Sequence, residues 1–96
     1  MKDLLKDLDK AFENKVRLGI MSALVVNDYL DFISLKELLD VTDGNLASHL
    51  KSLEQKEYVT YKKEFKGRKP HTRYWATARG KAAFKKHISA IERLLK

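Results

Sequence analysis

Residues 34–59 read SLKELLDVTDGNLASHLKSLEQKEYV, and this stretch decides the fold. Ser34 begins the capping-box pattern S-x-x-E, which predicts that a short helix starts there. Thr42 is a natural N-cap for a second helix, in which leucines follow at i, i+4 and i+7 from position 46. Two helices joined by a turn of about three residues predict a helix-turn-helix over residues 34–56.

The period of the apolar residues changes from helical to alternating after Glu57. Residues 58–65 and 71–76 predict two strands, and the intervening KGRKP predicts a turn too long for a two-residue hairpin loop. We therefore expect a hairpin over residues 58–76. The apolar side of its first strand is expected to hold Val59, Tyr61 and Phe65.

The remaining segments read as helices with one short strand. Apolar residues at helical spacing predict an N-terminal helix over residues 2–13, and Asn14 is a plausible cap for the central helix KVRLGIMSALVV that follows. The apolar pair Phe32–Ile33 predicts a strand stub. Thr77 is expected to cap a final helix over residues 77–96, whose apolar seam has heptad character.

The predicted order is helix, helix, stub, helix, helix, hairpin, helix, in a single domain over residues 1–96. The fold class is mainly α with a small β-hairpin, that is, α+β. A hairpin that directly follows the second helix of a helix-turn-helix is the layout of a winged helix, in which the hairpin is the wing.

Charge is divided unevenly along the chain. Residues 1–57 carry 8 Lys/Arg against 11 Asp/Glu, whereas residues 58–96 carry 12 against 2. A strongly basic half indicates a polyanionic partner, either nucleic acid or a membrane surface, and the alternative is a solvated basic face that maintains solubility. The chain has no cysteine, no apolar run long enough to span a bilayer and no signal-peptide pattern, so a cytoplasmic protein is expected.

Nothing in the sequence indicates catalysis. The histidines His49, His71 and His87 lie far apart without a paired metal motif, and there is no glycine-rich phosphate loop or serine-nucleophile elbow. We therefore expect no enzyme activity, no cofactor and no metal site.

The motif LASHLKSLEQKEYV and the strand-to-helix junction YWATARG resemble those of small winged-helix transcriptional regulators of the MarR/ArsR-like superfamily. The resemblance covers roughly residues 12–84. It implies a winged helix-turn-helix with flanking N- and C-terminal helices that dimerise, and double-stranded DNA as the partner. A small-molecule effector is a further possibility that the sequence does not identify.

The second helix of a helix-turn-helix enters the major groove. Its leucines must face the core, so the opposite face is available to DNA, although similar residues would also serve an ordinary solvated face. His49 either contacts DNA or holds the two helices together. The predicted DNA-binding residues of this helix are Thr42, Asn45, Ser48, His49 and Ser52.

The predicted wing concentrates positive charge around its turn, which suits contacts to the minor groove and the phosphate backbone. The alternative, a charged edge that prevents strand aggregation, accounts for one or two lysines. Trp75 is expected to pack under a neighbouring helix or subunit rather than to stack on a base. The predicted DNA-binding residues of the wing and its flank are Lys62, Lys63, Lys66, Arg68, Lys69, Arg73 and Arg79.

A chain of this size cannot easily cover the apolar faces of both terminal helices, so a homodimer built from them is expected; the alternative is that both helices pack within one chain. The predicted interface residues are Leu4, Leu5, Leu8, Phe12, Phe84, Ile88, Ile91 and Leu95. The predicted function is a homodimeric, sequence-specific DNA-binding transcriptional regulator. The alternatives are a protein–protein interaction module and a non-specific, chromatin-like DNA binder.

Overall fold

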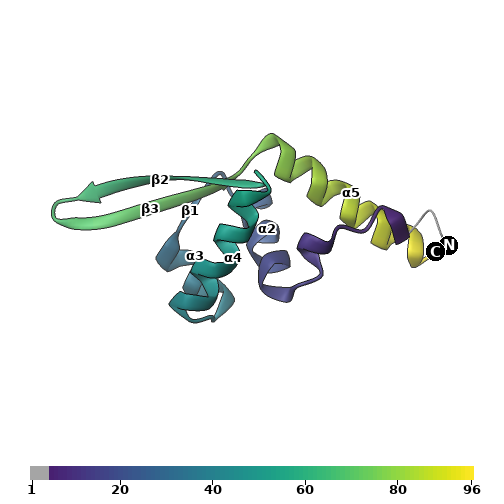
Figure 1. Cartoon of the computed structure of the whole chain (residues 1–96), viewed down its shortest axis with the longest axis horizontal. Coiled ribbons are helices and arrows are strands. Elements are labelled where there is room, and N and C mark those ends of the chain that lie inside the picture. The colour runs from purple at the N-terminus through teal and green to yellow at the C-terminus, as the bar shows by residue number, and fades with distance from the viewer. Residues whose placement is uncertain (1–4) are drawn as a thin grey trace.

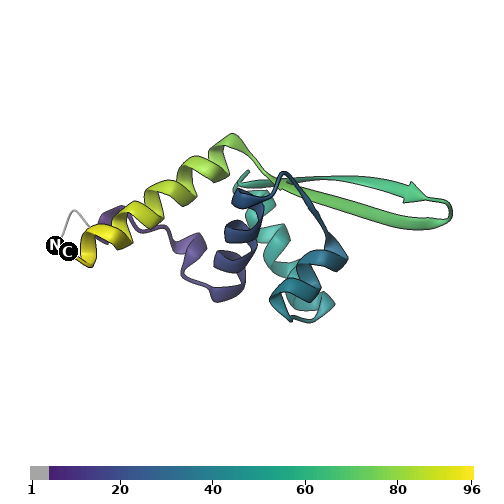
Figure 2. The ribbon, with the colours of Figure 1, turned by 180° about the vertical axis from the view of Figure 1, so that it is seen from behind.

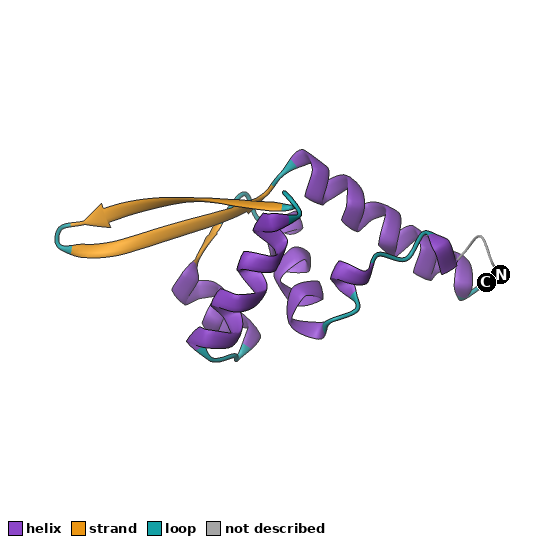
Figure 3. Cartoon of the chain, viewed as in Figure 1, coloured by secondary structure: helices purple, strands orange, loops and turns teal. Residues whose placement is uncertain are grey.

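The structure, a computed structural model, describes residues 5–96, which form a helical body with a long projecting hairpin (Figures 1 and 3). The three strands make one antiparallel sheet in the order β1-β3-β2. The hairpin extends from one side of the body and α5 from the other, so the molecule measures 53 × 24 × 21 Å. The elements are η1 (Lys10–Phe12), α2 (Lys15–Val26), β1 (Leu30–Asp31), α3 (Phe32–Leu39), α4 (Asp43–Gln55), β2 (Val59–Lys66), β3 (Lys69–Ala76) and α5 (Ala78–Leu94).

This architecture is a winged helix, and the predicted α+β class is confirmed. The core forms where α2, α3 and α4 meet beneath the root of the sheet. The leucines at positions 46, 50 and 53, predicted to face inward, are all buried. Together with side chains of α2 and α3 they make up the largest fully buried side chains, which are Ile20, Met21, Leu24, Leu35, Leu46, Leu50 and Leu53.

Three predicted helix caps are confirmed. Asn14 Oδ1 accepts hydrogen bonds from the backbone N–H groups of residues 16 and 17, at 2.9 and 3.1 Å. Thr42 Oγ1 accepts from the N–H of Asn45 at 3.2 Å, and Thr77 Oγ1 accepts from the N–H of Gly80 at 2.9 Å. Each bond satisfies an N–H group that the first helical turn leaves without a partner.

The start of α3 differs from the prediction. Asp31, not Ser34, is the N-cap, because its carboxylate accepts a hydrogen bond from the Ser34 N–H at 2.7 Å. The predicted strand stub Phe32–Ile33 is therefore the first turn of α3. The strand exists two residues earlier, where Leu30 and Asp31 pair with β3. The Asp31 carboxylate satisfies an N–H group of the first turn, so the helix begins before Ser34.

The wing also differs from the prediction, because its strands run to a two-residue turn. Lys66 pairs with Lys69, which leaves only Gly67 and Arg68 between the strands. Gly67 has a φ of +66° and Arg68 does not have a positive φ, the pattern of a type II′ turn with glycine first. The prediction of a longer turn was wrong because it treated Pro70 as part of the turn.

Pro70 lies within β3, opposite Phe65. Proline has no backbone N–H to donate, so a strand position with partners on both sides rarely holds it. Here β1 pairs with β3 only at Arg73 and Tyr74, so at Pro70 the strand β3 has a single partner. On the other side of β3 there is no strand at this position, so the sheet loses no hydrogen bond there because of Pro70.

The apolar side of the wing is only partly covered. Alternation along β2 places Val59, Tyr61 and Phe65 on one face, but only Val59 is buried. Tyr61 is 50% exposed and Phe65 is 67% exposed. The wing projects beyond the helices, so no second layer lies over its outer half (Figure 1).

The N-terminal segment does not form the predicted continuous helix over residues 2–13. Residues 5 and 6 are helical, the chain leaves the helix at Asp7, and η1 begins at Lys10; residues 2–4 lie outside the described part. The segment runs beside α5 (Figure 2). The backbone N–H of Asp9 donates to His87 Nδ1 at 3.0 Å, and Asp7 pairs with Arg93 at 2.7 Å. In this segment, contacts with α5 take the place of hydrogen bonds within a continuous helix.

The Tyr58 hydroxyl donates to the Asp9 carboxylate at 2.7 Å and so joins the N-terminal segment to the root of the wing. Burial, followed by this hydrogen bond, raises the pKa of Tyr58 to about 12. The folded state therefore retains a proton that the unfolded state loses near pH 10. We expect stability to fall as the pH rises from about 10 to 12.

Replacement of Tyr58 by Phe should remove the latest tyrosine step from an ultraviolet pH titration. It should also reduce the stability loss between about pH 10 and 12, and cost about 1 kcal/mol of unfolding free energy at neutral pH. Tyr29→Phe is the control, because Tyr29 is exposed. Identical alkaline stability profiles for Tyr58→Phe and the unsubstituted protein would contradict this assignment.

Candidate nucleic-acid interface

The exposed face of α4 carries short polar side chains at its N-terminal half. Thr42, Asn45 and Ser48 are exposed, and Ser52 is half-buried further along the same side. The buried leucines on the opposite side fix this orientation. Such side chains can contact base edges and phosphates, and the first turn of the helix also offers backbone N–H groups.

The charge at the start of α4 is balanced by α3. Asp43, in the first turn, would repel a phosphate, but Lys36 Nζ lies 2.7 Å from its carboxylate. Both side chains are well exposed, so the pair contributes little to stability. Its effect is local, since it removes a net negative charge from the face that presents Asn45 and Ser48.

One exposed cation on α4 was missed by the sequence analysis. Lys51 lies three residues after Ser48, and it is the one Lys or Arg of α4. Residues three apart on a helix share a face, so Lys51 extends the polar side of α4 with a positive charge. The signal was present in the spacing, but the prediction favoured uncharged residues.

His49 is half-buried and held by α2. Its Nδ1 lies 3.1 Å from Nη1 of Arg17, whose Nε donates to the backbone carbonyl of Ala11 at 2.7 Å. This contact links the two helices α2 and α4. It favours a structural role for His49 without removing the ring from the α4 surface.

The tip of the wing is the most concentrated positive region of the described chain. Its turn and flanking positions hold Lys66, Arg68 and Lys69, all exposed. Across residues 5–96, no ion pair involves any of these three cations. Lys63 is likewise exposed and without an ion pair in that range. These side chains are free to meet an anionic partner.

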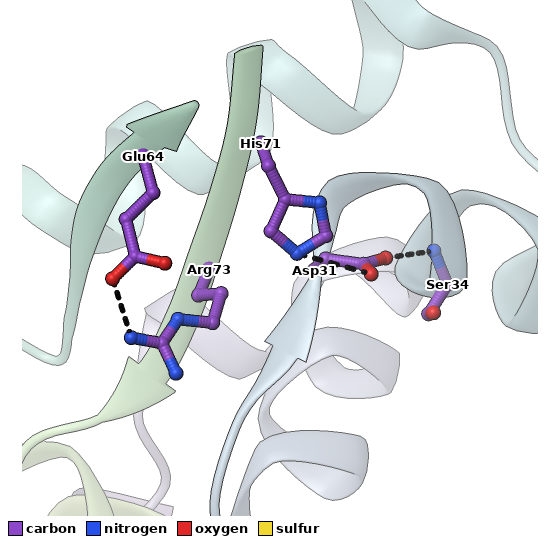
Figure 4. A network of polar contacts seen from close by, with 5 residues as sticks. All are labelled: Asp31, Ser34, Glu64, His71 and Arg73. Carbon is purple, nitrogen blue, oxygen red and sulfur yellow. Dashed lines mark hydrogen bonds and ion pairs between the residues drawn. The ribbon is translucent and has the colours of Figure 1, made fainter. Parts of the chain in front are cut away.

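Two of the predicted wing residues are instead engaged near its base. Arg73 Nη2 donates to Glu64 at 2.7 Å, and the guanidinium lies 4.9 Å from the centroid of the Tyr29 ring. Lys62 lies 3.7 Å from the same carboxylate. Figure 4 shows Arg73 turned toward Glu64 across the hairpin. Arg73 therefore braces the wing, and the free positive charge lies closer to the tip.

A second contact joins the wing to the helix-turn-helix. His71 Nε2 lies 3.6 Å from Asp31, the residue that caps α3 (Figure 4). The hydrogen bond from the Ser34 N–H, with smaller effects of nearby positive groups, lowers the pKa of Asp31. The carboxylate thus remains charged, and its contact with His71 joins β3 to the start of α3.

Arg79 lies at the other end of the wing, in the first turn of α5. Its Nη1 is 3.4 Å from Glu57, and both side chains are largely exposed. Because exposed pairs of this kind are weak, Arg79 can exchange Glu57 for another anion. Trp75 is half-buried and pairs across the strands with Thr60, on the face of the sheet opposite Tyr74.

The predicted interface residues differ in exposure. Phe12 is 2% exposed and packs on Tyr58, Phe84 and His87, so it belongs to the core and its prediction as an interface residue is wrong. Leu4 lies outside the described residues. Leu5 and Leu95 are exposed, the latter by 82%. Three residues of α5 are half-buried, namely Phe84, Ile88 and Ile91. Leu8, in the N-terminal segment, is half-buried as well.

Part of the α5 surface is an open apolar groove of about 440 Å³. Its apolar lining comes from Val25 on α2 and from Phe84 and Ile88 on α5. The helix turns a different side inward, where His87 (4% exposed) and Ala90 are buried. The outer side is thus an apolar strip that the described chain does not cover.

Neither a metal centre nor a membrane span is present in the described part of the chain. No three His, Asp or Glu side chains among residues 5–96 are placed to hold a metal ion. Every helix in that range is too short or too polar to cross a bilayer.

A winged helix with an exposed polar α4 and a cationic wing tip defines a class of DNA-binding domain. The chain belongs to this family, because the model for the winged helix DNA-binding domain matches residues 16–95. The fold and family are those of transcriptional regulators, which are generally not enzymes.

Individual proteins agree with this membership. The chain is 40% identical over 87 residues to an uncharacterized protein of Methanocaldococcus jannaschii, covering 91% of this chain and 95% of that one. A transcriptional regulator homologue from Pyrococcus horikoshii superimposes with a TM-score of 0.89 at 31% identity, over 99% of this chain and 95% of that chain. A putative MarR-family regulator from Enterococcus faecalis shares the fold, with a TM-score of 0.73 at 22% identity over 88% and 74% of the two chains. The predicted resemblance to small winged-helix transcriptional regulators is confirmed, and the likeness to the MarR-family regulator shows a shared fold.

Proposed function

We propose that the protein is a homodimeric, sequence-specific regulator of transcription that binds double-stranded DNA. In this proposal α4 reads base edges in the major groove, and the wing contacts the minor groove and the backbone. The observation that carries the proposal is the wing tip, where Lys66, Arg68 and Lys69 are exposed on a hairpin that projects beyond the helical body. Unpaired cations at this position suit the high negative potential of a groove.

The exposed residues of α4 supply the proposed specificity. Asn45 can pair bidentately with adenine, and Ser48 can contact a base edge or a phosphate. The cationic tip supplies affinity for any sequence. In this proposal the two elements divide the work, since the exposed face of α4 is mainly short and polar whereas the wing tip is cationic.

The proposed dimer uses the outer strip of α5. Ile88 and Phe84 line its apolar groove, and Leu95 extends the strip toward the C-terminus. A second copy of the chain is the proposed partner for this surface. A twofold axis there would set two copies of α4 about one DNA turn apart, roughly 34 Å, and so predicts a palindromic site.

A salt titration of DNA binding tests the proposal. If a dimer contacts six to eight phosphates, the logarithm of the association constant should fall against log salt with a slope of roughly −5 to −7. Fluorescence anisotropy with a labelled duplex measures this slope. A flat response would contradict the proposed mode of binding.

Replacement of Asn45 or Ser48 by Ala should change which DNA sequence the protein prefers, because a base contact is lost. We expect a loss of about tenfold on the preferred site and little change on unrelated duplexes. Competition between the preferred duplex and a scrambled one gives the ratio. Gln55→Ala, at the exposed C-terminal end of α4, is the control. Equal losses on both duplexes would show that these residues do not read the sequence.

Replacement of Ile88 by Glu should convert the dimer to a folded monomer, since it places a charge in the apolar groove. Sedimentation velocity measures the mass, and circular dichroism checks the fold. Ala82→Glu adds the same charge on an exposed part of α5 outside the groove and should leave the dimer intact. A dimer that persists in Ile88→Glu would place the interface elsewhere.

One observation favours a second candidate function. The exposed aromatic side chains of Tyr61 and Phe65 on the wing suit a protein partner, as expected for an interaction module. That function predicts no retention of DNA at about 0.1 M salt, whereas the proposed regulator remains bound.

A further inference from the structure

Two hydrogen bonds hold Arg17 of α2 in a fixed position beneath α4. Its Nε donates to the carbonyl oxygen of Ala11 in η1 at 2.7 Å, and its Nη1 lies 3.1 Å from His49 Nδ1. Its own backbone N–H is bound by the Asn14 cap. The side chain is half-buried, and α2 and α4 pack against each other. The Arg17 side chain is therefore held in place by the fold and is not a mobile surface cation.

The chemistry of this contact assigns the proton on His49. A guanidinium has donors but no acceptor, so the nitrogen that faces it must accept. In a neutral imidazole one ring nitrogen accepts and the other carries the hydrogen. Because Nδ1 of His49 accepts from Arg17, the hydrogen lies on Nε2.

The second nitrogen of His49 reaches the surface. Within residues 5–96 no hydrogen bond uses His49 Nε2, and it is not among the buried polar atoms that lack a partner. His49 lies four residues after Asn45 and three before Ser52, so the three share one stripe of α4. An N–H donor on this stripe would face the same DNA as Asn45 and Ser52.

We propose that Arg17 is a positioning residue that fixes His49 as an outward Nε2–H donor for a DNA phosphate or base acceptor. The inference rests on the proposed DNA-binding function and deepens it. His49 then has two roles: one nitrogen binds Arg17 of α2, rather than joining the two helices of the helix-turn-helix, and the other faces DNA. Arg17 acts through His49 and does not itself touch the DNA.

The free protein gives the first test. Long-range ¹⁵N NMR of the imidazoles should show His49 only in the Nε2–H tautomer, and Arg17→Met should convert it to a mixture. His87 is an internal control, because its Nδ1 accepts from the Asp9 N–H and no hydrogen bond joins it to Arg17. A His49 tautomer that is unchanged in Arg17→Met would overturn the assignment.

DNA binding gives the second test, with a matched set of substitutions. In His49→Asn an acceptor remains at the δ position, and the donor at the ε position is lost. We expect His49→Asn and Arg17→Met each to weaken binding about threefold to tenfold. Their combination should be no weaker than His49→Asn alone, since the two act through one contact.

Lys15→Met controls for the lost charge, because Lys15 is exposed on the same helix. It should weaken binding less than Arg17→Met does. His49→Asn that binds as tightly as the unsubstituted protein, or losses that add in the double variant, would overturn the inference. An unsubstituted protein that binds no duplex would overturn the proposed function instead, and the tautomer measurement would still decide the role of Arg17.

Discussion

Replacement of Gly80 by Ala is expected to destabilise the protein by about 2 kcal/mol. A Cβ at position 80 would lie 2.8 Å from the carbonyl carbon of Tyr58 and 2.9 Å from its Cα, with the carbonyl oxygen closer still. These are backbone atoms, so they cannot turn aside as a side chain can. Their displacement costs about 3 kcal/mol, and the better helix propensity of Ala returns about 1 kcal/mol.

The close approach at Gly80 has a structural reason. The Tyr58 carbonyl accepts a hydrogen bond from the Thr77 N–H at 3.0 Å, and the Thr77 hydroxyl donates to the Glu57 carbonyl at 2.6 Å. These bonds dock the start of α5 against the end of the helix-turn-helix. The glycine of the TARG junction is thus required by packing at the root of the wing.

Thermal unfolding measures the effect. For a domain of this size, 2 kcal/mol corresponds to a fall in Tm of about 8–16 °C. Gly44→Ala is the matched control, because nothing lies within 4 Å of its Cβ position and it occupies the first turns of α4. That variant should gain up to about 1 kcal/mol. Equal Tm changes for the two variants would contradict the predicted clash.

Replacement of Lys66, Arg68 and Lys69 by Ala is expected to weaken DNA binding at least a hundredfold at about 0.15 M salt. The two wings of a dimer would lose six cations, and each phosphate contact contributes about −0.9 to the salt slope. The slope should therefore become about −2 or shallower. Because these side chains make no ion pair within residues 5–96, the fold should remain stable, as thermal unfolding can check.

A second triple variant separates position from total charge. Lys6 and Lys10 belong to the N-terminal segment and Lys86 to α5, and both elements extend from the body on the side opposite the wing (Figure 1). Their replacement by Ala removes the same charge but should leave most of the salt slope. If both triple variants lose affinity equally, the wing has no special role and only the net charge matters.

The caps and the leucine spacing made the helices predictable. Asn14, Thr42 and Thr77 each bond to a group two or three residues away, so the whole interaction lies within a short stretch of sequence. Ser34 misled because Asp31, three residues earlier, accepts a hydrogen bond from the N–H of Ser34 itself and so begins the helix sooner. The rules for helix caps identified polar residues that can cap a helix, but they did not decide between Asp31 and Ser34.

Contacts between distant residues were beyond the sequence. The Asp9–His87 bond joins residues 78 apart, and the Arg17–His49 contact joins residues 32 apart. Neither leaves a periodic signal, so the broken N-terminal helix and the position of His49 could not be predicted. The alternation in β2 correctly assigned its residues to the two faces of the strand. It gave no sign that Phe65, in the outer half of the wing, lies beyond the core.

A selection from random duplexes tests the central proposal most directly. The purified protein is incubated with the pool at about 0.1 M salt, and the retained DNA is sequenced. The proposed homodimeric regulator predicts one enriched palindrome with half-sites about one helical turn apart. DNA retained without any enriched sequence would contradict specific recognition and indicate a general DNA binder, and a pool that is not retained would contradict DNA binding itself.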